Sequence, residues 1–159
     1  MTARVRYALA SAILVAAGFR GAARAQAPKP RPGDTEWIVP AEEKAKTSPF
    51  ASTPDGVARG RALYQKHCAT CHGETGHGDG PMAKLHAQRT SKAPYDLTDG
   101  DVQSSMSDGE VFWKVSSGFR KGQQVIMPAF KMLVPDPEDR WKIVHFVRSL
   151  GPAPRGAGR

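Results

Sequence analysis

Several features that mark enzymes and nucleic-acid-binding proteins are missing from this sequence of 159 residues. It has no Ser/His/Asp signature, no paired carboxylates within a motif and no glycine-rich phosphate loop in a helical context, which argues against an independent enzyme. No cluster of Lys or Arg is dense enough to indicate nucleic-acid binding. Internal repeats and strand-length runs of alternating hydrophobicity are also absent, which favours a helical domain.

Long apolar runs are scarce, and the one near the N-terminus, Ala8 to Phe19, is stopped by Arg20. That is shorter than the roughly 20 residues that a membrane-spanning helix requires. Arg4 and Arg6 precede the run, and a small-x-small site ending at Ala25 follows it. This order predicts a secretory signal peptide, with an uncleaved anchor as the alternative. We therefore expect export to the periplasm, either free there or at the outer face of the cytoplasmic membrane, and no transmembrane span after cleavage.

Acidic residues are few, with 15 Asp and Glu against 23 Lys and Arg, and the formal net charge is +8. The predicted signal peptide contains four arginines and no acid, so its removal lowers the charge to +4. A mildly basic mature chain suits encounter with an acidic partner or an anionic membrane, and equally an ordinary solvated surface.

Only two cysteines are present, and both lie in Cys68-Ala69-Thr70-Cys71-His72. Two thiols at this spacing can each add to a vinyl group of haem, and the adjacent imidazole can then bind the iron. A redox-active dithiol, half of a zinc site and a local disulfide are the alternatives. A redox-active dithiol needs a βαβ context, which the sequence does not show. A zinc site needs four ligands, and His67 and His72 would complete the set only in a cramped arrangement. The histidine directly after the second cysteine favours covalent haem.

A second iron ligand must come from far along the chain, because a residue close to His72 cannot reach the opposite face of a haem. Met127 is the best candidate, since it stands in an apolar stretch and the following Pro128 stiffens the backbone. Met132 is its competitor, and an open or histidine-ligated iron is the further alternative. Three other histidines are expected at the surface: His77, His86 and His145.

Capping residues and apolar periodicity predict three main helices. They begin at Thr53-Pro54-Asp55, at the capping box Ser107-Asp108-Gly109-Glu110 and at Asp136-Pro137. The first and last are expected to cross at Gly60 and Tyr64. A short helical turn is expected between Ala41 and Lys46, and two segments are expected to be turn-rich loops: 73–81 and 88–101.

The chain is therefore expected to have four parts: a signal peptide (1–25), an extended Pro-rich arm (26–53), a haem domain (54–150) and a flexible C-terminal tail (151–159). Two apolar pieces of the arm, Trp37 to Pro40 and Pro49-Phe50, are unusual for a solvent-exposed linker. We expect them to pack on the domain's own surface, and docking against a larger partner is the alternative.

Further short motifs accompany the C-x-x-C-H run in a fixed order: Gly60-x-x-x-Tyr64, Gly78-Asp79-Gly80-Pro81, Pro94-Tyr95-Asp96-Leu97-Thr98, Asp108-Gly109-Glu110, Met127-Pro128-Ala129-Phe130 and the helix containing Trp141. In this order, over about residues 54–150, the chain resembles the class I monohaem cytochromes c of the bacterial periplasm. The pairing of C-x-x-C-H with a later Met-Pro is the specific part of the likeness.

The resemblance implies an all-α cytochrome c fold, in which a few helices wrap around one covalently attached haem c. It implies thioether bonds from Cys68 and Cys71 and axial iron ligands from His72 and Met127. In such proteins a proline carbonyl in the loop after the motif often accepts the proximal histidine's hydrogen bond. Here that proline is Pro81, with a simple turn proline as the alternative.

The activity implied by the resemblance is single-electron transfer and not catalysis. The protein would act as a carrier or as the cytochrome subunit of a respiratory or dehydrogenase complex. Its partners would be redox proteins, a donor and an acceptor, with a membrane respiratory complex among the candidates. The alternative is a haem-based small-ligand sensor or enzyme with an open iron position.

Overall fold

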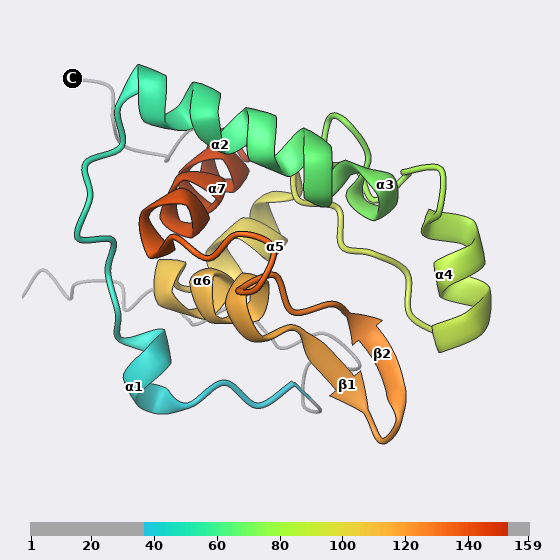
Figure 1. Ribbon diagram of the computed structural model, residues 1–159. Coiled ribbons are helices and arrows are strands. Elements are labelled where there is room, and N and C mark those ends of the chain that lie inside the picture. Colours follow the sequence, from blue (N-terminus) through green and yellow to red (C-terminus); the bar gives the residue numbers. More distant parts are fainter. Residues whose placement is uncertain (1–36, 153–159) are drawn as a thin grey trace, which may run out of the picture.

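The structure is a computed structural model that describes residues 37–152, and Figure 1 shows their arrangement. These residues form helices α1 (Ala41–Lys44), α2 (Pro54–His67), α3 (Ala69–His72), α4 (Ala83–Thr90), α5 (Gly100–Ser105), α6 (Asp108–Ser117) and α7 (Pro137–Leu150), with strands β1 (Phe119–Lys121) and β2 (Gln124–Met127). The mostly helical architecture confirms the predicted fold class. The predicted signal peptide, the first part of the arm and most of the tail lie outside the described residues.

The three main helices begin where their capping residues predict. The Thr53 hydroxyl accepts a hydrogen bond from the Gly56 amide at 3.1 Å, and the Asp136 carboxylate accepts one from the Glu138 amide at 2.8 Å. Ser107 caps α6 in the same way, accepting from the Glu110 amide at 3.1 Å. Each cap satisfies a backbone N–H that has no partner inside its helix, which fixes the point where the helix begins.

Helices α2 and α7 pack closely against each other at one end of the molecule (Figure 1). A Cβ atom added at Gly60 would lie 1.9 Å from the Lys142 carbonyl oxygen, so the two backbones touch at this position. One turn further along α2, the buried Tyr64 ring meets the Phe146 ring with centroids 5.0 Å apart. The predicted crossing is thereby confirmed. Arg59 and Asp139 join the same two helices through an ion pair of 2.6 Å.

The segment after α3 contains more helix than the sequence indicated. Helix α4 ends, and helix α5 begins, inside the segment 88–101, for which the sequence predicts a loop. The Asp99 side chain accepts from the amides of Asp101 and Val102, at 2.7 and 3.1 Å, and buried Val102 holds α5 against the core. Helices this short carry too little apolar periodicity to be seen in a sequence, because tertiary contacts supply most of their stability.

The environment of His145 contradicts the prediction of a surface residue, since only 8% of it is exposed. Helix α7 packs against α2 and also against α6, so its buried surface is wider than the single stripe that its sequence pattern indicated. His145 lies between buried Val144 and Phe146 in this doubly covered part of the helix.

The arm packs against the domain through Trp37, Val39 and Phe50, as predicted, whereas Ile38 is 80% exposed. Val39 is buried, Phe50 packs against the hydrophobic core, and the Trp37 ring stacks on Phe119 with centroids 4.8 Å apart. Helix α1 lies against α6, where the Ser107 hydroxyl donates to the Lys44 carbonyl at 2.7 Å. Between residues 37 and 152 no helix is both long and apolar enough to cross a membrane.

Gly60→Ala should destabilise the protein by about 1–3 kcal/mol, because the added methyl group forces α2 away from the α7 backbone. An open helical glycine would instead gain about 1 kcal/mol from the same change, so the sign of the effect tests the crossing. Denaturant unfolding of the purified protein measures it. Ala58→Ser on the exposed side of α2 is the control and should change stability by less than about 0.5 kcal/mol. A more stable Gly60→Ala variant would contradict the close contact.

Candidate haem-binding site

The C-x-x-C-H motif lies where α2 ends and the single turn of α3 follows. The Cys68 amide donates to the Tyr64 carbonyl at 2.7 Å, and the His72 amide donates to the Cys68 carbonyl at 2.9 Å. Cys68, Cys71 and His72 are therefore at positions i, i+3 and i+4 of one helical turn. Side chains at this spacing share one face of a helix, so both thiols and the imidazole can reach the same ligand.

The loop after the motif folds back on α3 and satisfies its carbonyls. The Gly78 amide donates to His72 at 2.8 Å, the Gly80 amide to Cys71 at 3.2 Å and the Met82 amide to Thr70 at 2.9 Å. From the other side, the buried Tyr64 hydroxyl donates to the Gly73 carbonyl at 2.9 Å. The motif is thus held between α2 and its own loop, which fixes the direction of its side chains.

A cavity of about 930 Å³ lies beside the motif, within the size range of cofactor sites. Cys71 and His72 line it from α3, Cys68 lines it from the residue before α3, and Met127 lines it from β2. A second, smaller cavity of about 70 Å³ also contacts Cys68, His72 and Met127. The structure therefore brings together all four residues that the sequence predicted for the site. Met132, the competing methionine, is 81% exposed and lines neither cavity.

Much of the remaining wall of the larger cavity is apolar and aromatic. Side chains of β1, β2 and the segment after β2 contribute to it: Phe119, Val125, Ile126, Phe130 and Leu133. A wide apolar cavity with two thiols and an imidazole at one wall fits a porphyrin, whose ring is apolar and whose vinyl groups react with thiols.

The His72 imidazole is half-buried and oriented by the backbone. Its Nδ1 lies 3.3 Å from the Tyr95 carbonyl oxygen. Burial lowers the pKa of His72, the hydrogen bond to Tyr95 opposes this, and nearby His86 lowers it further. A neutral imidazole that donates through Nδ1 presents the lone pair of Nε2, which is the form that binds a metal.

The acceptor for His72 differs from the expected one, which was the Pro81 carbonyl. Pro81 is exposed, and its loop contacts α3 through amide groups. The segment that passes beside His72 comes later in the chain and is tied to the loop by the Leu97 amide, which donates to the Gly76 carbonyl at 2.7 Å. Tyr95 was part of a recognised motif, but its role depends on this contact between distant segments.

The Cys68 thiol is buried and the Cys71 thiol is half-buried, and these environments oppose thiol redox chemistry. Burial, together with the nearby Cys71 thiol, raises the pKa of Cys68 to about 12, and burial also raises the pKa of Cys71. Redox-active dithiols have a lowered pKa, because the thiolate is the reactive form. Among the described residues, no group of three or more His, Cys, Asp and Glu side chains is arranged to hold a metal ion.

Met127 is carried by a β-hairpin that the sequence did not indicate. Strands β1 and β2 are antiparallel, with Met127 opposite Phe119. Gly118, at φ +64°, ends α6, and a Cβ atom there would lie 2.4 Å from the Met127 carbonyl oxygen. The Phe130 amide then donates to the Val115 carbonyl at 3.0 Å. The chain is therefore held against α6 both at Met127 and three residues after it. The sequence did not indicate this hairpin because strands of three and four residues are too short to produce an alternating pattern of hydrophobicity.

Comparisons with known proteins identify the family of the chain. The family model Cytochrome c matches residues 57–151. No curated protein matches the chain. A chain of the Kuenenia stuttgartiensis reducing HAO-like protein complex is 25% identical, with a TM-score of 0.53 over 66% of this chain and 48% of that chain. This protein therefore spans about half the length of that neighbour. The structure titled KustC0563 c-type cytochrome is also 25% identical, with a TM-score of 0.47, over 58% of this chain and 98% of that one.

The match to the family model covers more than half of the sequence and includes the whole C-x-x-C-H motif. With only two cysteines in the chain, the attachment of one haem is the arrangement that the sequence allows. The protein belongs to the cytochrome c family of electron-transfer proteins and contains covalently bound haem c with its iron.

Proposed function

We propose that this cytochrome transfers single electrons through one haem that is attached by Cys68 and Cys71 and ligated by His72 and Met127. The observation that carries the proposal is the convergence of these four side chains on one cavity, although Met127 lies far along the chain from the motif. The haem iron supplies the one-electron Fe(II)/Fe(III) couple.

Each of these residues has a separate task in the proposal. The thiols hold the cofactor irreversibly, and the Tyr95 carbonyl fixes the orientation of the His72 ring. The Met127 thioether favours the reduced state and raises the potential, as is usual for His/Met ligation. If His72 and Met127 both hold the iron, no position on it would be left for a substrate, which suits electron transfer.

The larger cavity reaches the protein surface at Val125 and Leu133, which line it and are 42% and 62% exposed. We propose this rim as the place where redox partners approach. The predicted signal peptide supports export to the periplasm. The likeness to a chain of a reducing HAO-like protein complex supports work as a subunit of an oxidoreductase complex, beside the alternative of a free carrier.

Replacement of both cysteines, Cys68→Ala with Cys71→Ala, should abolish covalent haem, because no other thiol is present in the chain. A denaturing gel stained for haem measures this, on protein exported from cells that make c-type cytochromes. Thr70→Ser, between the two cysteines, is the matched control and should keep the stain. Covalent haem on the double variant would refute the attachment site.

Met127→Ala should remove the sulfur-to-iron charge-transfer band from the oxidised spectrum and allow the reduced protein to bind carbon monoxide. Met132→Ala is the matched control, since this exposed side chain lines neither cavity, and it should leave the spectrum unchanged. A native reduced protein that already binds carbon monoxide would favour the alternative function, a ligand sensor or enzyme with an open iron position.

Gly118→Ala should weaken the bond from Met127 to iron, because the added methyl group would collide with the Met127 carbonyl and move the strand. We expect the charge-transfer band of the oxidised protein to be lost at a lower denaturant concentration, or at a lower temperature, than in the parent protein. Gly122→Ala separates this contact from backbone strain. Gly122 also has a positive φ, of +58°, but a Cβ atom there meets nothing within 4 Å. It should lose about 1–2 kcal/mol of stability and keep the band; equal spectra for the two variants would disprove the role of Gly118.

A further inference from the structure

Trp37 forms part of the wall of the haem cavity although it precedes the segment that matches the family model. Its ring lines both the larger and the smaller cavity. Phe119 stacks on one side of it, with centroids 4.8 Å apart and planes 19° from parallel. The Lys114 ammonium lies 4.8 Å from the ring centroid. These contacts fix the plane of the indole and with it the direction of its N–H.

The indole nitrogen of Trp37 is buried and has no hydrogen-bond partner within residues 37–152. Buried indole N–H groups nearly always find an acceptor, because an unmet donor loses its bond to water without replacement. The ring also lines the cavity in which the haem must lie. The acceptor is therefore expected to belong to the cofactor.

The charged groups around the two cavities suit an anionic ligand. Within the described residues, Lys92 and Lys121 line the larger cavity, Lys114 and Arg148 line the smaller one, and no Asp or Glu lines either. Each haem carries two propionate carboxylates, and a carboxylate removed from water requires donors or cations around it. The walls thus match the acidic edge of the cofactor.

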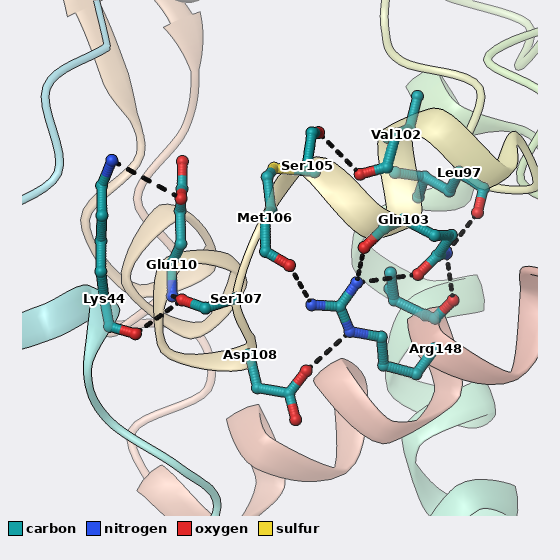
Figure 2. A network of polar contacts seen from close by, with 11 residues as sticks. Lys44, Leu97, Val102, Gln103, Ser105, Met106, Ser107, Asp108, Glu110 and Arg148 are labelled. Carbon is teal, nitrogen blue, oxygen red and sulfur yellow. Dashed lines mark hydrogen bonds and ion pairs between the residues drawn. The ribbon is translucent and has the colours of Figure 1, made fainter. Parts of the chain in front are cut away.

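The two cations of the smaller cavity already have partners, which leaves the indole as the unsatisfied donor there. Arg148 donates to the Asp108 carboxylate, to the Met106 carbonyl and to Gln103, as Figure 2 shows. The Lys114 ammonium pairs with the Glu110 carboxylate at 2.9 Å and contacts the Met106 sulfur at 3.2 Å. Their positive charges still contribute to the potential at the cavity, whereas most of their hydrogen-bond donors are in use.

The arm is anchored so that Trp37 cannot drift from this position. The Ser107 hydroxyl donates to the Lys44 carbonyl, and the Lys44 ammonium lies 3.8 Å from the Glu110 carboxylate (Figure 2). Buried Val39 lies between α1 and Trp37 in the chain and adds apolar contact. The capping residues of α6 therefore also hold the arm.

We propose that the arm completes the haem site, with the indole N–H of Trp37 donating a hydrogen bond to a haem propionate. The proposal rests on the haem attachment described under the proposed function. It assigns a cofactor-binding role to a residue outside the segment that matches the family model. The arm is then part of the haem environment and more than a linker.

Proton NMR of the reduced, diamagnetic holoprotein tests the contact directly. The chain has three tryptophans, so three indole N–H signals are expected, and the one lost in Trp37→Phe identifies Trp37. We expect this proton to exchange slowly with water and to show nuclear Overhauser contacts to propionate methylene protons. Contacts only to residues 1–36, or to no haem proton, would overturn the inference. Absence of covalent haem, seen beforehand on the stained gel, would instead count against the proposed function.

Trp37→Phe should also lower the reduction potential, because it keeps the stacked ring but leaves the propionate charge less compensated, which favours Fe(III). Trp113→Phe is the matched control, since Trp113 lies on α6 and lines neither cavity. Its potential should equal that of the parent protein. An unchanged potential in Trp37→Phe, with the haem attached and low-spin, would show that Trp37 does not bind the propionate.

Discussion

The close crossing of α2 and α7 at Gly60 is the constraint on which the rest of the structure depends. Because a glycine stands there, the α2 backbone can touch the Lys142 carbonyl, and Tyr64 one turn later is buried against Phe146. Cys68 follows about two turns after Gly60. The position of the attachment motif is therefore tied to the helix crossing, and Tyr64 extends this link to the loop beyond the motif through its bond to Gly73.

The second half of the site is built on α6, which packs against α7 on one side and against α1 on another. Gly118 ends this helix and lets β2 pass close by, so that the strand with Met127 is held at a fixed distance from the core. The two proposed iron ligands thus belong to two parts of the structure that are joined through α7 and also through α4, which contacts both α3 and β2. Ligands that are held rigidly suit electron transfer, since the coordination of the iron should change little between its oxidation states.

The arm extends the same frame beyond the segment shared with the family. Its contacts with the N-terminal end of α6 and with Phe119 place an indole ring in the cavity wall. An apolar residue in a Pro-rich arm could equally have served a partner protein. The packing of Val39 and Trp37 favours a role within the chain for these two side chains, whereas Ile38 between them is 80% exposed.

Features that rest on local chemistry could be predicted from the sequence. The motif at residues 68–72 carries two thiols and an imidazole within one helical turn, the three capped helix starts depend on neighbouring residues, and the crossing depends on one glycine in a helix. Four other features arise from tertiary packing: the hairpin that carries Met127, the helices α4 and α5, the burial of His145 and the choice of the Tyr95 carbonyl as acceptor. Each of these depends on contacts between segments far apart in the chain, which leave no periodic or capping signal in the residues themselves.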